Sequence, residues 1–165
     1  MLLKIGGTSV EGITDFYALS IALTFSEKIS RLAFITGVGS GASGLQISLL
    51  LGRGDAFTVM LDDDKAGKTS ANKYRAEWYL TNQSAFTVGE LLPDFKSKRL
   101  EGFLSEALVE DIMAQQSLTS RPPKKQIGLF LAEKFSSGAE KNPFDNETQS
   151  RFEKLLQALQ DRFPT

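Results

Sequence analysis

Histidine and cysteine are both absent from this 165-residue sequence, and each absence excludes a class of chemistry. Without cysteine there is no disulfide, no thiolate metal site and no thiol nucleophile, which fits a reducing cytoplasm. Without histidine there is no Ser-His-Asp triad, no His-ligated zinc and none of the usual general bases. Any catalysis must therefore depend on carboxylates, lysine, tyrosine, hydroxyl groups or a metal ion held by carboxylates.

Long apolar runs and a strong net charge are missing as well. No run approaches the roughly 18 residues needed to span a bilayer, and no signal peptide opens the sequence. The formal net charge is −1, so no overall basic field attracts a polyanion. Hydrophobic residues make up 41% and charged residues 24%, which is ordinary for a globular protein. We therefore expect a cytoplasmic protein with a buried core and no membrane contact.

Short apolar segments alternate with helical patterns in the first half of the sequence. This alternation predicts an α/β fold in which a mainly parallel sheet is flanked by helices. The Gly-Gly-Thr-Ser stretch at residues 6–9 is expected to break the first strand, and Thr14 is expected to cap the first helix. Strands are predicted at residues 2–5, 31–36 and 56–61, and helices at 14–28, 42–51 and 66–81.

The second half has a different character, with one short edge strand and then helices. A loop containing Pro122 and Pro123 separates two of these helices. We expect a helical C-terminal extension over residues 96–165, packed on an α/β domain over residues 1–95. The strand is predicted at residues 85–88, the loop at 117–125, and the helices at 98–116, 127–135 and 147–163.

Carboxylates occur at two points where an expected strand meets an expected helix. Glu11 and Asp15 are four residues apart, so a helix that begins between them stacks them on one face. Asp62 and Asp64 alternate after the third strand and can face one side, while Asp63 points away and caps the next helix. Because ligands gather at the carboxyl ends of parallel strands, these residues are predicted to form one site.

A site of this composition favours a hard divalent cation. Several carboxylates without a cation would repel one another and raise their pKa values. Oxygen ligands suit Mg²⁺ or Mn²⁺, and two such ions roughly 4 Å apart are usual in enzymes that cut phosphodiesters. A solvated turn or a helix cap explains either cluster taken alone, whereas the ordered pair favours metal binding.

The two clusters resemble the motifs of the Toprim domain, a metal-dependent module of topoisomerases, bacterial primases and several nucleases. The resemblance covers about residues 8–95 and lies in Glu11-Gly-Ile-Thr-Asp15, Asp62-Asp-Asp64 and Asp64-Lys-Ala-Gly67. It implies a Rossmann-like Toprim fold in which Glu11, Asp15, Asp62 and Asp64 are metal ligands. The glycine-rich stretch at residues 6–9 departs from the family, whose first strand runs unbroken into the glutamate.

Within that family, Phe86-Thr-Val-Gly-Glu-Leu-Leu-Pro93 is similar to a segment of the OLD (overcoming lysogenization defect) nucleases of phage defence. The resemblance implies two-metal cleavage or nicking of DNA, with Glu11, Asp62 and Asp64 catalytic. It also implies a partner ABC-type ATPase domain or subunit, leaves room for a homo-oligomer, and places a tail lysine near the scissile phosphate. Lys124 and Lys125 are the candidates, with Lys125 preferred, and a solvated loop cation is the alternative for both.

Two further segments could contact a phosphate backbone. Residues 37–41 lack the Lys-Ser/Thr ending of a P-loop, and they are either a loop that offers N–H groups to a phosphate or a plain turn. The helix after the Asp triplet has a basic face that guides a phosphate backbone or is simply solvated. Its aromatic residues are expected to pack against the sheet rather than stack on bases. The basic face comprises Lys65, Lys68, Asn72 and Arg75, and the aromatic residues are Tyr74, Trp78 and Tyr79.

Other functions remain open at this point. A different Toprim chemistry, such as RNA processing or primer synthesis, would use the same carboxylates. A non-catalytic module that binds nucleic acid or a partner is the other alternative, and failure to bind Mg²⁺ would support it.

Overall fold

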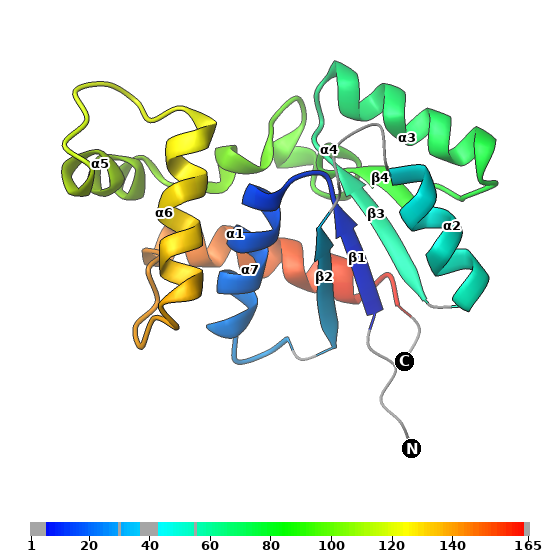
Figure 1. Cartoon of the computed structure of the whole chain (residues 1–165), viewed down its shortest axis with the longest axis horizontal. Helices are drawn as coiled ribbons and strands as arrows, with labels where there is room; N and C mark the ends of the chain where they lie inside the picture. The colour runs from blue at the N-terminus through cyan, green and yellow to red at the C-terminus, as the bar shows by residue number, and fades with distance from the viewer. Residues whose placement is uncertain (1–5, 30, 37–42, 55, 164–165) are drawn as a thin grey trace.

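A four-stranded parallel sheet forms the centre of the protein in the computed structural model, which describes residues 6–29, 31–36, 43–54 and 56–163 (Figure 1). The strand order is β2-β1-β3-β4, and each neighbouring pair is parallel. The predicted α/β class is thereby confirmed. The strands are β1 (Gly6–Val10), β2 (Leu32–Thr36), β3 (Phe57–Leu61) and β4 (Ala85–Thr87).

Strand β1 corrects the sequence analysis, because residues 6–9 form the strand that they were expected to break. The strand is central and pairs with β2 on one side and β3 on the other. Thr8 is fully buried and its hydroxyl lies 3.1 Å from that of Thr58, so polar residues inside the sheet satisfy each other. The strand predicted at residues 2–5 lies outside the described residues. Since β1 ends at Val10, it leads directly into Glu11.

Helices cover both faces of the sheet. The connection after β1 leads to β2 on one side, and the connection after β3 leads to β4 on the other. Helix α1 (Ile13–Thr24) connects β1 to β2 on one face, and helix α3 (Lys65–Glu77) connects β3 to β4 on the other. Helix α2 (Ser43–Arg53) lies on the same face as α3 (Figure 1). Strands β1 and β3 are adjacent, and their outgoing connections diverge. Their carboxyl ends therefore border the crevice where open α/β sheets bind ligands.

Each face of the sheet has its own apolar core. Val59 and Leu61 of β3 point toward α2 and α3, where they pack with Ala71 and Tyr74. Met60 points to the opposite face, because successive strand residues alternate. The larger core on that face joins α1 to the C-terminal helices. Its fully buried side chains include Leu19, Phe86, Phe103, Ile112, Leu131, Phe152, Leu155, Leu156 and Leu159.

The C-terminal half consists of helices of different lengths and two 3-10 turns. The single helix predicted over residues 98–116 is wrong, because Ser105 interrupts it. The Ser105 side chain accepts from the Leu108 N–H and so begins a new helix. The elements are α4 (Val88–Leu91), η1 (Pro93–Phe95), η2 (Leu100–Phe103), α5 (Glu106–Gln115), α6 (Lys124–Ser136) and α7 (Asn146–Gln160).

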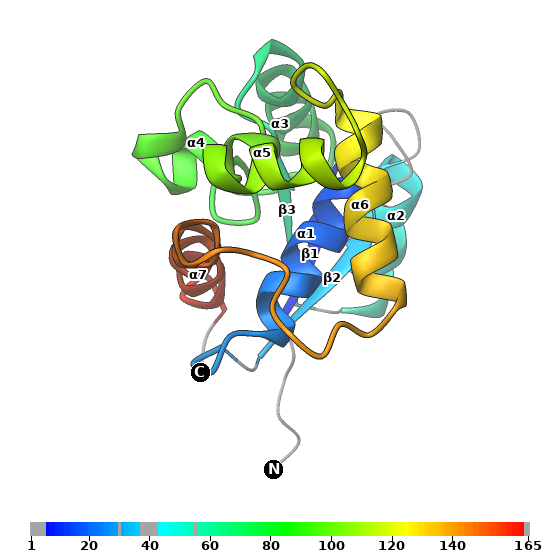
Figure 2. The ribbon, with the colours of Figure 1, turned by 90° about the vertical axis from the view of Figure 1, so that its left-hand side faces the viewer.

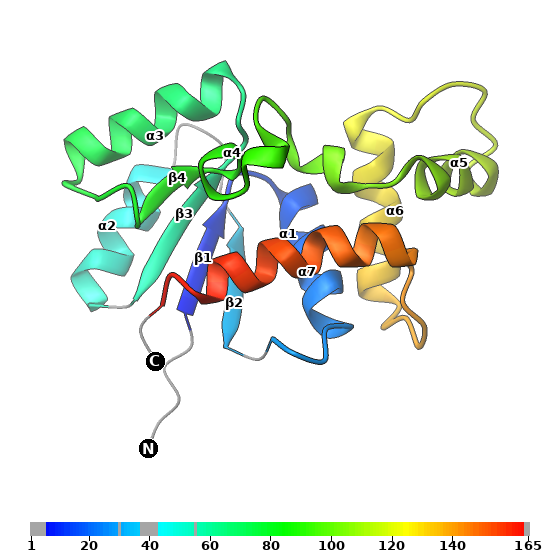
Figure 3. The same cartoon turned by 180° about the vertical axis from the view of Figure 1, so that it is seen from behind.

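Helices α6 and α7 pack directly on α1. Gly128 of α6 comes so close to Thr14 of α1 that an added Cβ would lie 2.8 Å from the Thr14 hydroxyl oxygen. Helix α7 crosses the strands and α1 (Figure 3), and its Phe152 ring stacks with those of Phe103 and Phe144. Figure 1 shows α5 and α6 at the end of the molecule opposite α2, and Figure 2 shows this end facing the viewer, with α7 seen along its axis. Residues of 1–95 and of 96–165 thus share one core.

Helix boundaries differ from the predictions at two points that affect the site. Gly12, rather than Thr14, precedes the first turn of α1, and Thr14 is a buried residue inside the helix. Helix α3 ends at Glu77, because Tyr79 has a left-handed backbone with φ of 53°. In the described part of the chain, no helix has both the length and the apolar character needed to cross a membrane.

Candidate functional site

Glu11, Asp15 and Asp62 come together at the carboxyl edge of the sheet, between β1 and β3. Glu11 follows β1 and Asp62 follows β3, and Val10 and Met60 are register partners in the pair of strands. Asp15 lies in the first turn of α1, four residues after Glu11. Electrostatic repulsion couples Asp62 to both neighbours and contributes to raised pKa values. Three of the four predicted ligands thus occupy one acidic cluster.

Lys124 provides the positive charge in this cluster. It is the first residue of α6, and its Nζ lies 3.8 Å from Asp15 Oδ1 and 3.9 Å from Asp62 Oδ2. Glu101 is closer still, with Oε1 2.9 Å from Nζ. The Lys124 side chain remains 44% exposed, so one side of the ion cluster faces solvent. Sequence analysis missed Glu101, because it lies in a 3-10 turn remote from both motifs.

Burial strongly disfavours charge on Asp15 and Asp62. Asp15 is 4% exposed, and desolvation raises its pKa to about 7 even though the Lys124 ammonium opposes the shift. Asp62 is 8% exposed, and desolvation raises its pKa to about 6 against the opposing effects of Lys124 and the Leu100 N–H. Near neutral pH, one ammonium is therefore too little positive charge for this set of carboxylates.

Three buried carboxylate oxygens in the cluster have no hydrogen-bond donor among the described residues, and one of them, Glu101 Oε1, forms the 2.9 Å ion pair with Lys124. Asp15 Oδ2 accepts from the Gly12 N–H at 3.1 Å, but Asp15 Oδ1 has no such partner and faces Lys124 from 3.8 Å. Glu11 Oε2 is also buried without a donor in the described part of the chain. Buried acceptors normally have partners, because an unsatisfied one costs about 1–3 kcal/mol. These oxygens are suited to a ligand that supplies positive charge.

Asp63 has a different role from its neighbours. It is 2% exposed, its carboxylate accepts from the Thr87 hydroxyl and the Ser97 N–H, and Lys68 Nζ lies 3.0 Å away. Burial raises its pKa, but these hydrogen bonds and the Lys68 ammonium together lower it below the ordinary value. The expectation that Asp63 caps the next helix is wrong. Its carboxylate instead makes structural contacts that connect the end of β3 to β4 and to the segment after η1.

Asp64 is the residue that caps α3. Its Oδ1 accepts from the Gly67 N–H at 2.9 Å, and its Oδ2 lies 3.1 Å from Arg99 Nε. The Gly67 N–H is the main cause of its lowered pKa, and Arg99 lowers it further against a smaller effect of burial. Asp64 was expected to join Asp62 as a metal ligand, but both of its oxygens are engaged elsewhere.

The segment of residues 97–100 contacts all three aspartates of the triplet. Ser97 has a left-handed backbone with φ of 61°, a conformation that L-residues seldom adopt. Because each aspartate accepts a hydrogen bond from a different residue of this segment, the three carboxylates are held in different orientations. Leu100 N–H donates to Asp62, Ser97 N–H donates to Asp63, Arg99 donates to Asp64, and Lys98 O accepts from the Asp63 N–H.

Lys124 and Lys125, the two candidate tail lysines, occupy different positions. Lys124 belongs to the ion cluster described above. Lys125 is exposed, and among the described residues it makes no hydrogen bond or ion pair. The structure therefore brings the first of the two predicted candidates, and not the preferred one, to the acidic residues.

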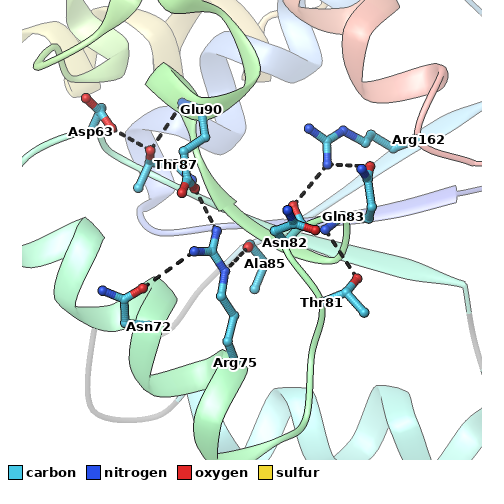
Figure 4. A network of polar contacts seen from close by, with 10 residues as sticks. All are labelled: Asp63, Asn72, Arg75, Thr81, Asn82, Gln83, Ala85, Thr87, Glu90 and Arg162. Carbon is cyan, nitrogen blue, oxygen red and sulfur yellow. Dashed lines mark hydrogen bonds and ion pairs between the residues drawn. The ribbon is translucent and has the colours of Figure 1, made fainter.

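The expected basic face of α3 is partly used for internal contacts. Lys68 pairs with Asp63, and Arg75 donates to Ala85 O at 2.8 Å and to Glu90 Oε2 at 2.7 Å. Figure 4 shows Arg75 pointing at β4 and α4, where Glu90 also accepts from the Thr87 N–H. These two cations hold α3 to the sheet.

The aromatic residues of α3 divide into buried and exposed ones. Tyr74 is buried in the core between α3 and the sheet, and Trp78 packs against that core, as expected. Tyr79 is 90% exposed, which differs from the expected packing. Residues 37–41, the predicted phosphate-contacting loop, lie outside the described residues.

The acidic cluster fits a divalent cation in its chemistry but not in its present arrangement. Its metal-binding atoms would be carboxylate oxygens, the ligands that Mg²⁺ and Mn²⁺ prefer, and those of Glu11 and Asp15 include one buried oxygen each without a donor in the described residues. Among the described residues, however, no group of three or more acidic side chains is placed so that it could hold a metal ion. Instead, the Lys124 ammonium lies 3.8 Å from Asp15 and 3.9 Å from Asp62.

Comparison with known proteins adds no relative: no family model, curated protein or solved structure matches this chain. Function must therefore be argued from the residues and the geometry of the site.

Proposed function

We propose that this protein is a Mg²⁺- or Mn²⁺-dependent endonuclease of Toprim type, which cleaves or nicks DNA. The observation that carries the proposal is the pair of buried, unpaired oxygens on Glu11 and Asp15. They lie beside Asp62 at the carboxyl ends of β1 and β3, where the connections of the parallel sheet diverge to opposite sides. Carboxylates gathered at such a point, with pKa values raised by burial, support the proposal of a ligand site rather than a structural ion pair.

The residues of the site would divide the work as follows. Glu11, Asp15 and Asp62 would hold the metal, and Asp64 would orient the first turn of α3 beside them. Bound divalent ions would supply activation of water and neutralisation of phosphate charge. Lys124 would contact the phosphate from the solvent-facing side, which makes it the tail lysine of the mechanism in place of Lys125.

DNA as substrate and an ABC-type ATPase as partner follow from the motif resemblance. The net charge of −1, and the internal use of Lys68 and Arg75, support weak intrinsic affinity for a polyanion. The partner would therefore supply most of the affinity for DNA.

Plasmid cleavage tests this proposal directly. The chain would be incubated with supercoiled plasmid and Mn²⁺ or Mg²⁺, beside Glu11→Gln, Asp62→Asn and the control Asp111→Asn. Asp111 is an exposed residue of α5 whose carboxylate contacts Gln115, so its change removes one charge far from the site. We expect nicking by the parent and the control, and at least a hundredfold loss in the two site variants.

Equal nicking by all four proteins would contradict the site assignment. Absence of cleavage together with absence of Mn²⁺ binding would instead favour a second function, a non-catalytic module. The ion cluster around Lys124 favours that alternative, because an internal ammonium already neutralises part of the acidic charge. Calorimetric titration with Mn²⁺ separates the two.

A further inference from the structure

We propose that Lys124 is a built-in counter-cation, which a divalent ion must displace from Asp15 and Asp62, and that Glu101 retains the displaced ammonium at the site. This inference rests on the proposed metal site and specifies its regulation. It assigns a role to Glu101, a residue that belongs to neither acidic motif.

The distances around Lys124 show which contacts are easily given up. Its Nζ forms one close contact, 2.9 Å to Glu101 Oε1, and two longer ones, 3.8 Å to Asp15 and 3.9 Å to Asp62. The longer contacts are at the limit for ion pairs, and neither is a hydrogen bond. Lys124 can therefore leave Asp15 and Asp62 while it keeps its best partner.

Asp15 provides the independent sign that a ligand is missing from this arrangement. Only 4% of Asp15 is exposed, and its Oδ1 has no donor among the described residues. A lysine at 3.8 Å attracts that oxygen without satisfying it. A divalent ion satisfies a carboxylate oxygen at much shorter range, at about 2.0–2.1 Å for Mg²⁺.

The position of Lys124 makes its displacement feasible. The ammonium is carried by a flexible stem at the first turn of α6, and 44% of the side chain is exposed. Movement toward solvent and Glu101 therefore requires no change in the packing of α6 on α1. The same movement leaves the ammonium beside the site, where it is available to a phosphate oxygen. Metal binding would thus convert a neutralising lysine into a substrate-contacting one.

Glu101 is a positioning residue in this scheme, since it acts through Lys124. Without Glu101 the ammonium would lose its best partner and bind Asp15 and Asp62 more closely. Mn²⁺ would then compete against a stronger internal ion pair. If Glu101 were itself a metal ligand, its removal would also weaken Mn²⁺ binding, and a double variant separates the two possibilities.

Mn²⁺ titration of the whole chain, followed by calorimetry and by the electron paramagnetic resonance signal of free Mn²⁺, tests the inference. The proteins are the parent, Lys124→Met, Glu101→Gln, the double variant, Asp62→Asn and the control Lys125→Met. Lys125 is the adjacent residue of α6 and carries the same charge, but it makes no ion pair among the described residues. Circular dichroism confirms that each variant is folded.

We expect Lys124→Met to bind Mn²⁺ on the order of tenfold more tightly than the parent, and Lys125→Met to change affinity less than twofold. Glu101→Gln should weaken binding in the parent background and have no effect in the Lys124→Met background. Mn²⁺ binding by Lys124→Met but not by the parent would also support the inference, because it would show that Lys124 blocks the site completely.

Three outcomes would overturn the inference. Binding that depends on Asp62 but is equal in Lys124→Met and Lys125→Met would remove the counter-cation role and leave the proposed metal site intact. A Glu101→Gln effect that persists in the double variant would make Glu101 a ligand. Failure of both the parent and Lys124→Met to bind Mn²⁺ would end the metal proposal and this inference together.

Discussion

Asp62 and Asp63 are adjacent in the chain and almost equally buried, yet their surroundings are opposite. Asp63 is surrounded by a hydroxyl, a backbone N–H and an ammonium, and its pKa is lowered. Asp62 has one backbone N–H and a distant ammonium, lies near other carboxylates, and has a raised pKa. Burial alone therefore does not distinguish a structural carboxylate from one available to a ligand. The supply of donors does.

The same contrast separates the two sides of the sheet edge. Between β3 and β4, Asp63 and Glu90 take part in a connected network with Thr87 and Arg75 (Figure 4). Between β1 and β3, Asp15 and Glu11 retain unpaired oxygens within the described residues. The first arrangement stabilises the fold, whereas the second one costs stability, a cost that the proposed cation would remove.

The largest loss of stability is expected at Asp63, whose carboxylate has a full set of hydrogen-bond and ion-pair partners. Asp63→Asn leaves the Lys68 ammonium without its partner and removes the charge that three donors share, so it should lower the free energy of unfolding by about 3 kcal/mol. Urea denaturation at pH 7 in metal-free buffer measures this loss, with Asp111→Asn as control. A loss below that of the control would show that the network contributes nothing.

The free energy of unfolding of the metal-free protein should decrease as pH rises from 5 to 8, whereas acid denaturation lowers it as pH falls. A carboxyl group whose pKa is raised by folding, such as Asp15 at about 7 and Asp62 at about 6, binds protons more tightly in the folded chain. The folded state therefore loses stability as pH rises through these values. With no histidine in the sequence to mask the effect, we expect a decrease of about 2 kcal/mol from pH 5 to pH 8 in chelator. A flat or rising profile in urea would contradict the raised pKa values.

Removal of the Asp15 charge should stabilise the metal-free protein. In Asp15→Asn the amide oxygen can still accept from the Gly12 N–H, while a desolvated charge disappears. We expect a gain of about 1 kcal/mol at pH 8 and almost none at pH 5, measured by thermal or urea unfolding. Destabilisation at pH 8 would mean that the Lys124 ion pair outweighs the cost of burial.

The smallest effect is expected at the exposed pair of Arg99 and Asp64. Arg99 is 61% exposed at its side chain, so Arg99→Gln should cost less than about 1 kcal/mol. The Asp64 cap on Gly67 remains in this variant. A larger loss in the same unfolding assay would indicate that Arg99 orients residues 97–100 against the triplet.

The sheet and the positions of two carboxylate clusters could be predicted from the sequence, because apolar strands and helical periodicity alternate clearly. The roles within Asp62-Asp63-Asp64 could not. Strand alternation places Asp62 and Asp64 on one side only while the strand continues, and β3 ends at Leu61. The partners that decide each role come from residues 97–100, which are distant in sequence and mostly without motif character.

Strand β1 and the ion cluster show the same limit. Gly-Gly-Thr-Ser has low intrinsic strand preference, and it forms a strand because β2 and β3 pair with it on both sides. Glu101 was missed because a 3-10 turn brings it to Lys124 through packing rather than through spacing. The preference for Lys125 over Lys124 had no support in the sequence, and the ion pairs of Lys124 at the start of α6 distinguish the two.

The attachment of residues 97–100 and Lys124 to the acidic edge has a consequence for the order of events during synthesis. The ribosome releases the chain from its N-terminus, so the sheet and its aspartates emerge before the residues that orient and neutralise them. A nascent chain thus passes through a stage in which Asp15 and Asp62 have been made and Lys124 has not. Completion of the site is a late step in biogenesis, and a chain interrupted before α6 would carry the acidic residues without the lysine that balances them.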